Sequence, residues 1–518
     1  MTGLVARTKN AHVDRASEVG TQAESLTSPL RREGGETLHR QIERRIRAAI
    51  ADGRLRPGVR LMSTRVLARE LGIARITAQT GYDQLIAEGY LSVDGRRGTC
   101  VATDLPERWV DLGSPTTGQS DRFPGLNPWA ATSPVTPPIA SAAAAIELGP
   151  EWFGMETLDS RGWERLLVRA WRELASEPDS SVATYAAPLG DRRLRAALAD
   201  HLAVRRGVRC SADAIAMTAG ATAAFAAIAR TWLGPDRICA VEDPGGEQIR
   251  RALGGAGARI VPVPVDERGI RVDRLPSRAD VLFVTPSWQY PAGGSLSLPR
   301  RLALLRWATD VGAVVIEDDC ESELRYDGEP LPSLQGLASD GRVVYVSTFS
   351  KVLFPGLRTG YMVVPDLHRG PLLAALEAGG RPPAAVEQRA LAMLLEGGGF
   401  HRHIRRLRAA YAARRDAFID ALVAEDVGLE VRRASAGGHL VVGILDARWT
   451  ATVMARALAD IGIRMETLSA NRLIDAPDDE LVVYLGRHDA TKLVGVATEL
   501  GRLMRAGSPE MTGPTSPR

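Results

Sequence analysis

The chain has 518 residues, more than one hydrophobic core usually organises, so two or more domains are expected. Its 45% hydrophobic and 25% charged residues are typical of a globular protein, and no apolar run reaches the ~20 residues that span a bilayer. The four cysteines lie far apart and lack the paired spacing of a metal site. This pattern argues against a disulfide scaffold and predicts a protein of the reducing cytoplasm.

Changes in composition divide the chain into five segments. Residues 1–34 are polar, lack the apolar core of a signal peptide and are expected to form a disordered tail. Periodic structure over residues 35–103 is followed by a Pro/Ser/Gly-rich linker at 104–145. Residues 146–506 alternate β-rich runs with helical segments, which predicts an α/β domain with a largely parallel sheet. Residues 507–518 are expected to be a second loose tail.

Positive charge is concentrated in the small N-terminal domain. Although the net charge of the whole chain is only +3, twelve arginines and six acidic residues lie between Leu38 and Thr103. A basic small domain beside a slightly acidic large one suggests an anionic partner such as nucleic acid. A solvated charged surface is the alternative interpretation.

Three helices and a hairpin are predicted in this small domain. Apolar residues recur every four positions from Leu38 to Ile50, as on one face of a helix. Ser63 can cap a second helix that ends at Gly72, and a third helix follows over residues 74–89. Two short alternating runs, YLSV and TCVA, then flank a turn that carries two arginines. This order of elements predicts a winged helix-turn-helix.

Exposed polar side chains near the helix starts and at the hairpin tip are the candidates for DNA contact. A helix can fill the major groove, where side chains near its start reach base edges, while a basic wing meets the backbone or minor groove. Each candidate taken singly could be an ordinary solvated side chain, whereas the set predicts DNA binding. The candidates are Arg65, Arg75, Thr77, Gln79, Arg96 and Arg97.

This segment resembles a GntR-type winged helix over its whole length. The matching positions are Leu61-x-Ser63-x-Arg65, Leu67-Ala68, Leu71-Gly72, Arg75-x-Thr77, Tyr82, Leu85, Glu88-Gly89-Tyr90-Leu91 and Gly98-Thr99. The sequence departs from the family at Met62, where proline is usual, and at Ala74, where serine is usual. Gly81 lies inside the third helix, where glycine costs about 1 kcal/mol relative to alanine. We expect it to loosen the helix without removing its contact face.

Lysine is nearly absent from the chain. Only Lys9, Lys351 and Lys492 occur among 65 basic residues, and Lys351 is expected to be the only lysine of the folded region. It follows a predicted strand, RVVYVS, at the end where parallel sheets bind ligands. Arginine cannot supply a deprotonatable primary amine that forms a Schiff base with an aldehyde. Lys351 is therefore the candidate for covalent attachment of a cofactor, with chance retention of a surface lysine as the alternative.

Neighbouring segments carry groups that suit a pyridine ring and a phosphate. The predicted strand from Val314 to Ile316 ends in acids, and a carboxylate there can hold a pyridinium nitrogen protonated; Asp318 is the candidate. Ala221 and Thr222 begin an Ala-rich helix, whose first N–H groups can bind phosphate. Further phosphate contacts are expected from Thr348, Ser350 and Arg358.

The large domain resembles a fold-type-I aminotransferase, and the two domains together resemble the MocR group of GntR regulators. The resemblance implies that pyridoxal 5'-phosphate forms a Schiff base with Lys351, with Asp318 at its pyridinium nitrogen and Thr348 and Arg358 at its phosphate. It also implies a homodimer through the large domains, so that two winged helices meet repeated half-sites of promoter DNA. The matching motifs are EDPG (242–245), VPVDERG (263–269), TPSWQYPAG (285–293), the EDD stretch and STFSKVLFPGLRTGY (347–361).

The positions expected around the cofactor ring and the substrate depart from the family pattern. Gly246 stands where tyrosine usually lies against the ring, Cys320 where tyrosine donates to the phenolic oxygen, and Trp288 where histidine is usual. Tyr484 is aligned with the arginine that usually binds the substrate carboxylate, with Arg487 as a nearby alternative. Loss of that arginine forfeits a charge-assisted bond of roughly 1.5–3 kcal/mol, so plain α-amino acids are expected to bind poorly.

Three functions are compatible with these observations. The favoured one is a DNA-binding regulator whose large domain senses pyridoxal phosphate, or an amine adduct of it, without turnover. The alternatives are a working aminotransferase with an accessory DNA-binding module, and a regulator that has lost cofactor binding. Retention of Lys351 argues against the last of these.

Overall fold

A computed structural model describes residues 26, 28–30, 37–51, 54–94, 98–103, 146–149, 157–177, 184–185, 187–326, 332–433 and 436–507. They form two compact units, one mainly of residues 1–118 and one covering most of the remaining chain. The predicted tail at 1–34 lies outside the described residues except for 26 and 28–30. The predicted linker at 104–145 lies wholly outside them, and so does the predicted tail at 507–518 apart from Gly507.

Within its described residues, the smaller unit consists of three helices and a hairpin, as predicted. The elements in chain order are α2 (Leu38–Ala51), α3 (Thr64–Leu71), α4 (Arg75–Ala87), β1 (Leu91–Asp94) and β2 (Gly98–Val101). The two strands pair antiparallel. The core is made by the apolar residues that the periodicity selected, since Ile42, Ile46, Ile50, Leu67, Tyr82 and Leu85 are all buried.

Local chemistry fixes the helix ends and the packing of this unit. Ser63 caps α3 by accepting a hydrogen bond from the Val66 N–H, and Gly72 ends the helix in the left-handed conformation at φ 62°. A Cβ on Gly81 would lie 3.2 Å from the His39 carbonyl oxygen and 3.5 Å from Ile42 Cγ2. Gly81 therefore lets the backbone of α4 pack directly on α2, which explains a residue that helix propensity disfavours.

The larger unit is built on an eight-stranded sheet with the strand order β4-β11-β10-β9-β8-β5-β6-β7. Strands β5, β6, β8, β9 and β10 are parallel, and β11 runs antiparallel to its neighbours β10 and β4. The carboxyl ends of the five parallel strands therefore lie along one edge of the sheet. The strands are β4 (Ile215–Thr218), β5 (Ile238–Asp243), β6 (Arg259–Asp266), β7 (Gly269–Ile270), β8 (Val281–Val284), β9 (Val314–Asp318), β10 (Val343–Thr348) and β11 (Gly360–Val363).

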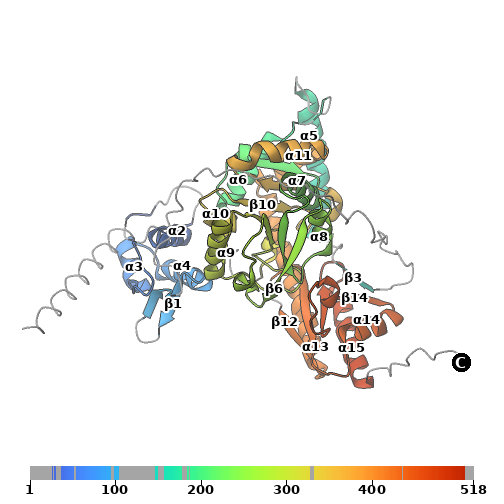
Figure 1. The fold of residues 1–518 in the computed structure, drawn as a ribbon. Coiled ribbons are helices and arrows are strands. Elements are labelled where there is room, and N and C mark those ends of the chain that lie inside the picture. The colour runs from blue at the N-terminus through green and yellow to red at the C-terminus, as the bar shows by residue number, and fades with distance from the viewer. Residues whose placement is uncertain are drawn as a thin grey trace, which may run out of the picture. The chain divides into compact units, whose positions relative to one another are not determined.

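Helices cover both faces of this sheet (Figure 1). Alternate residues of its strands pack against the two helical layers. Ile316 and Val344 pack with α7, α8 and α11, whereas Val315 and Val343 pack with α9 and α10. Both faces are buried, which is why the central strands read as continuous apolar runs in the sequence. The helices are α6 (Arg192–Arg206), α7 (Ala221–Trp232), α8 (Glu247–Gly254), α9 (Leu298–Val311), α10 (Leu334–Leu337) and α11 (Arg369–Ala378).

A second sheet of five strands, in the order β12-β13-β15-β14-β3, completes the larger unit. Its strands are β3 (Ile146–Leu148), β12 (Leu429–Arg433), β13 (His439–Ile444), β14 (Ile463–Thr467) and β15 (Glu480–Tyr484). The remaining helices are α5 (Ser160–Ser176), α12 (Ala385–Glu396), α13 (Gly399–Ala424), α14 (Ala451–Asp460) and α15 (Ala490–Ala506). No helix in the described part of the chain combines the length and the apolar character that a bilayer span requires.

A second lysine, Lys492, lies within the folded larger unit. Lys492 lies in the first turn of α15, where its N–H donates to Asp489, and its side chain is exposed. The prediction that Lys351 is the only lysine of the folded region is therefore wrong. Lys492 lies within the segment 146–506 that is predicted to fold as the α/β domain. Of the two lysines in the described residues, Lys351 is the one that follows a strand of the parallel sheet.

Gly360→Ala is expected to destabilise the larger unit. A Cβ at this position in β11 would lie 2.9 Å from the Gly220 carbonyl carbon and 3.0 Å from the Ser347 carbonyl oxygen, and backbone atoms cannot give way cheaply. We expect a loss of about 1–3 kcal/mol in unfolding free energy. The matched control is Gly495→Ala on the exposed surface of α15, where a Cβ would meet nothing within 4 Å.

This control should stabilise the protein by about 0.5–1 kcal/mol, because alanine loses less conformational entropy than glycine in a helix. Urea or thermal unfolding followed by circular dichroism measures both variants. Equal effects of the two substitutions would contradict the packing argument.

Candidate functional site

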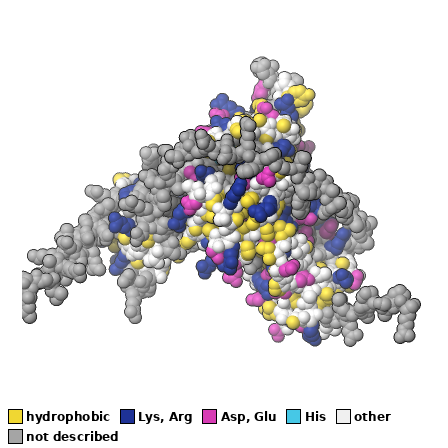
Figure 2. Space-filling view, viewed as in Figure 1, with side chains coloured by type: hydrophobic (Ala, Val, Ile, Leu, Met, Phe, Trp, Pro, Cys, Tyr) yellow, Lys and Arg dark blue, Asp and Glu magenta, His cyan; other side chains and the backbone are white. Residues whose placement is uncertain are grey.

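Two arginines of the smaller unit lie at helix starts and point into solvent. Arg65 is in the first turn of α3 and Arg75 is the first residue of α4, and both side chains are exposed. Neither forms an ion pair with any residue in the described ranges. Basic side chains are visible over this unit in Figure 2. Unpaired guanidinium groups at a helix start are suited to phosphates or to guanine edges.

The other predicted DNA-binding residues are partly buried, hydrogen-bonded within the unit or outside the described residues. Thr77 is half-buried on α4. The amide of Gln79 is engaged within the unit, because its Oε1 accepts from Thr64 Oγ1 at 3.2 Å and its Nε2 donates to Asp83 Oδ1 at 2.7 Å. Arg96 and Arg97 lie outside the described residues.

Arg60 was missed in the sequence, where only the hairpin tip was considered. It forms a β-bridge with Cys100 beside the hairpin, and its side chain is exposed. Its guanidinium lies 3.8 Å from the position of a Cβ on Gly98, at the base of the wing. The signal that could have found it is its place in a short extended run just ahead of α3.

A cradle for an anion forms at the start of α7. Gly220 precedes the helix at φ 84° with no side chain capping it, so the first N–H groups of Ala221 and Thr222 point out of the helix end. Arg358 lies beside this end, since its Nη2 donates to the Ala219 carbonyl at 3.4 Å and stands 3.4 Å from where a Cβ on Gly220 would be. A helix start, a guanidinium and a glycine that leaves room together suit a phosphate.

Two hydroxyl groups lie where β10 ends, Thr348 in its last position and Ser350 on the loop that follows. Ser350 Oγ is 3.1 Å from Thr348 Oγ1, which also accepts the Ser350 N–H at 3.1 Å. Thr348 Oγ1 lies 3.2 Å from the Thr359 carbonyl, in the residue next to Arg358. The turn that carries Lys351 is thereby linked to the turn that carries Arg358, and the structure brings these predicted residues to one edge of the sheet.

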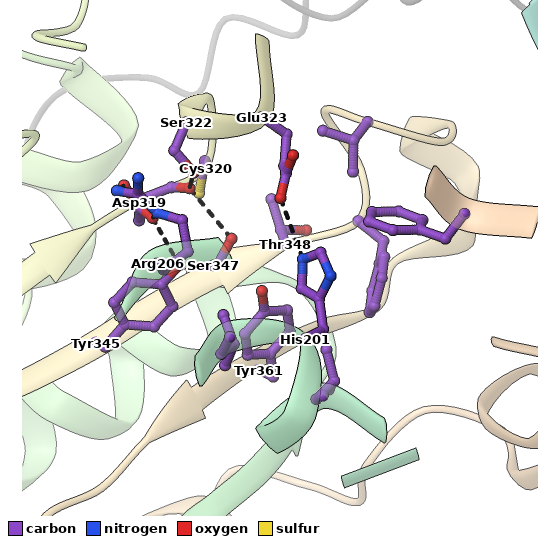
Figure 3. Close-up of a pocket in the computed structure, with 15 residues that line it drawn as sticks. His201, Arg206, Asp319, Cys320, Ser322, Glu323, Tyr345, Ser347, Thr348 and Tyr361 are labelled. Carbon is purple, nitrogen blue, oxygen red and sulfur yellow. Dashed lines mark hydrogen bonds and ion pairs between the residues drawn. The ribbon is translucent and has the colours of Figure 1, made fainter. Parts of the chain in front are cut away.

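The two aspartates that end β9 have opposite surroundings. Arg206 binds Asp319 in a bidentate pair, with Nε–Oδ2 at 2.6 Å and Nη2–Oδ1 at 2.8 Å, and the Tyr345 hydroxyl donates to the same carboxylate at 2.6 Å (Figure 3). Asp318 is also buried, but no cationic side chain among the described residues pairs with it. Its carboxylate accepts the Cys320 N–H at 3.2 Å, and burial raises its pKa to about 6.

This difference selects Asp318 as the group that fits a pyridinium nitrogen. Asp319 is already neutralised by Arg206, whereas Asp318 is a buried acid whose ionised form needs a cation. A protonated ring nitrogen would supply both the charge and the hydrogen bond. The residues present therefore fit pyridoxal phosphate, with its ring nitrogen at Asp318 and its phosphate at the start of α7.

Lys351 lies within electrostatic reach of this acidic strand end. Burial alone would raise the pKa of Glu321, yet His439 and the Lys351 ammonium hold it at about 2. Burial and Asp318 raise the pKa of the Cys320 thiol, against the opposing charge of Lys351. The primary amine thus lies on the same edge as Asp318, as covalent attachment of a ring cofactor requires.

Comparisons with known proteins agree with this geometry. The family model "Bacterial regulatory proteins, gntR family" matches residues 38–101, and "Aminotransferase class I and II" matches residues 158–474. The pyridoxine biosynthesis transcriptional regulator PdxR of Corynebacterium glutamicum is 35% identical over 90% of this chain and 96% of its own length. The probable rhizopine catabolism regulatory protein MocR of Rhizobium meliloti is 33% identical over 90% of this chain and 94% of its own.

The chain belongs to the MocR-type group of GntR-family transcriptional regulators. Its large unit has the fold of the aminotransferases. Kynurenine aminotransferase of Pyrococcus horikoshii, solved with the cofactor's amine form PMP, covers 70% of this chain and 91% of its own with a TM-score of 0.64 and 25% identity. The multiple substrate aminotransferase of Thermococcus profundus gives a TM-score of 0.65 at 24% identity.

Three of the positions at which this MocR-type regulator departs from the family pattern lie near one another in the larger unit: Gly246, Trp288 and Tyr484. A Cβ on Gly246 would lie 3.4 Å from Tyr290 Cε1, so the tyrosine of the neighbouring loop takes up room beside the glycine. Trp288 is buried, its Nε1 has no hydrogen-bond partner among the described residues, and a Cβ on Gly437 would overlap it at 2.1 Å. The large indole is therefore accommodated by a glycine on a segment far away in the sequence.

Tyr484, aligned with the usual carboxylate-binding arginine, lies in this region. Its hydroxyl is 2.8 Å from the Tyr290 hydroxyl and donates to Glu466 Oε2 at 3.1 Å. Arg487, the alternative candidate, pairs instead with Glu147 at 2.8 Å with a partly exposed side chain. The structure thus places a phenol beside a carboxylate at this position, which disfavours binding of a substrate carboxylate.

Asp318→Asn is expected to stabilise the cofactor-free protein in a pH-dependent way. Because the folded-state pKa is raised from 3.8 to about 6, the native protein binds more protons than the unfolded chain between these values, and Asp318 destabilises it as pH rises through that range. The gain should be near zero at about pH 4 and reach roughly 2–3 kcal/mol above pH 6.

Unfolding midpoints at several pH values measure this effect. The control, Asp319→Asn, should destabilise the protein across the same range because it leaves Arg206 buried without its partner. A loss of stability for Asp318→Asn at pH 8 without cofactor would contradict the assignment.

Proposed function

We propose that this regulator binds pyridoxal phosphate covalently through Lys351 and changes its affinity for promoter DNA when that cofactor, or an amine adduct of it, occupies the large unit. The observation that carries the proposal is the buried Asp318 without a cation beside the arginine-paired Asp319. When bound, the cofactor supplies an aldehyde that captures primary amines and a ring that withdraws electrons.

Each of the predicted residues has a defined task in this proposal. Lys351 Nζ attaches the cofactor, and the Asp318 carboxylate holds the ring nitrogen protonated. The Arg358 guanidinium provides the bidentate contact to the phosphate. The remaining phosphate contacts come from the N–H groups of Ala221 and Thr222 and from the hydroxyls of Thr348 and Ser350.

The same geometry supports sensing without turnover. Tyr484 and Glu466 occupy the place where a cation would bind a substrate carboxylate, so α-amino acids lack their usual anchor. Cys320 replaces a phenol, and a thiol is a weak hydrogen-bond donor to the cofactor's ring oxygen. Both changes weaken positioning of an amino acid for proton transfer while leaving Lys351 and Asp318 in place.

The regulator is proposed to act on DNA as a cytoplasmic homodimer. Two winged helices would then contact repeated half-sites, with α4 in the major groove and Arg65, Arg75 and Thr77 facing the DNA. The relative from Corynebacterium glutamicum is named for regulation of pyridoxine biosynthesis, which supports a cofactor form as effector. An exogenous amine that reacts with the bound cofactor is the second effector class compatible with the site.

The attachment site is directly testable because the chain has only three lysines. Purified protein mixed with pyridoxal phosphate should develop a visible absorbance band, and borohydride should fix one cofactor per chain on the peptide that contains Lys351. Lys351→Ala should abolish the fixed adduct, whereas the control Lys492→Ala should retain it. An adduct that persists unchanged in Lys351→Ala would refute the proposal.

The absence of turnover is tested by mixing the cofactor-loaded protein with common amino acids and a keto acid. We expect no keto-acid product above the rate of free pyridoxal phosphate, because the carboxylate anchor is missing. Gel-shift titrations with upstream DNA, with and without cofactor, then measure the coupling. Rapid product formation would instead identify a working aminotransferase.

A further inference from the structure

Ile76 is an exposed apolar side chain at the second position of α4. It is 70% exposed, while the buried face of the same helix consists of Ala78, Gly81, Tyr82 and Leu85. Single exposed apolar residues are common on protein surfaces, so exposure alone carries no meaning. The residues around Ile76 on the outer face of α4 show what kind of ligand this surface can contact.

Two polar neighbours of Ile76, Gln79 and Thr80, have their hydrogen-bonding groups engaged within the unit. Gln79 is held through both ends of its amide, by Thr64 on one side and Asp83 on the other. Thr80, one turn after Ile76, donates its hydroxyl to the Ile76 carbonyl oxygen at 2.9 Å. That bond turns the hydroxyl back to the helix and leaves the threonine methyl for the outer face.

The start of α4 is therefore an apolar surface beside a free cation. Ile76 and the Thr80 methyl provide the apolar part, and exposed Arg75 provides the charge. No acidic residue lies in the first turn of α4, and no side chain caps it, so the helix end is itself electropositive. This combination attracts a polyanion and offers it few hydrogen bonds to base edges from this face.

We propose that Ile76, with the Thr80 methyl, reads the C5-methyl group of a thymine in the operator. Thymine is the only base that presents an apolar group in the major groove, so an apolar reader selects it over the other three bases. The inference rests on the proposed entry of α4 into the major groove and adds a base preference to it. Each contact should be worth about 4-fold in affinity, the value of one buried methyl-sized group.

The test removes the methyl group from the DNA instead of from the protein. An operator is first selected from random-sequence DNA by the full-length regulator, and each thymine is then replaced by uracil, which lacks only the methyl. We expect one thymine per half-site at which uracil lowers affinity about 4-fold, and about 15-fold when both half-sites are changed. Ile76→Ala should bind the thymine operator more weakly than the native protein does and should distinguish thymine from uracil by clearly less than 4-fold, because only the alanine and Thr80 methyl groups remain to contact the thymine methyl.

Two further variants keep the outcomes separate. Val423→Ala removes an aliphatic side chain of equal exposure, 70%, from α13 of the larger unit, and should keep full discrimination between thymine and uracil. Arg75→Ala should weaken binding to all DNA, because it removes a charge from the helix start. Thermal melts confirm that each variant is folded.

The outcomes distinguish the thymine contact of Ile76 from the entry of α4 into the major groove. If Arg75→Ala weakens binding but no uracil replacement does, the thymine inference is overturned and the entry of α4 stands. If Arg75→Ala leaves DNA binding unchanged, α4 does not lie in the groove, and the proposed mode of DNA binding fails with it. If Ile76→Ala loses as much affinity on uracil substitution as the native protein does, Ile76 does not read the methyl group and the inference is overturned.

Discussion

The buried ion pair between Arg206 and Asp319 is the constraint on which the proposed cofactor site depends. Arg206 ends α6 and Asp319 follows β9, 113 residues apart, and both side chains are almost wholly excluded from solvent. Removing one partner of such a pair typically costs 3–5 kcal/mol, because a buried charge is left uncompensated. The Arg206 guanidinium also donates to Ser287, which ties the loop before Trp288 to the same point.

The pair acts by orienting the end of β9. Asp319 is drawn toward Arg206 and Tyr345, and because neighbouring residues of an extended chain point to opposite sides, Asp318 is directed the other way. Ser347 on β10 and Ser322 further hold the Asp319 carbonyl, at 3.3 and 3.2 Å. One acid is thus neutralised so that the adjacent one can remain without a cation until a ligand supplies it. Among the described residues at this strand end, Arg206 therefore pairs with Asp319 and leaves Asp318 without a cation.

The sequence predicts the types of element well and the partners of individual residues less well. Lys351 stands out by the rarity of lysine and Ser63 by its place before an apolar run, and both signals are local. The choice of Asp318 over Asp319 depends physically on Arg206, which no spacing within the EDD stretch reveals. Gly81 is disfavoured by helix propensity until the carbonyl of His39 is seen against it. The engaged amide of Gln79 likewise depends on Thr64 of another helix.

The buried Asp318 carboxylate, which no described cation pairs with, affects how strongly ligand binding would stabilise the proposed sensor. A buried acid with a raised pKa costs the cofactor-free protein stability near neutral pH, and a ligand that supplies a cation removes that cost on binding. Part of the free energy of ligand binding would therefore come from removing the destabilisation that ionised Asp318 causes in the ligand-free protein. This stabilisation would act on the end of β9, where Asp318 lies. A domain that no longer anchors a substrate carboxylate can still respond strongly to occupancy, because the response depends on Asp318 and not on chemistry at the substrate. Retention of Lys351 and Asp318 alongside Tyr484 and Cys320 is what such a sensor requires.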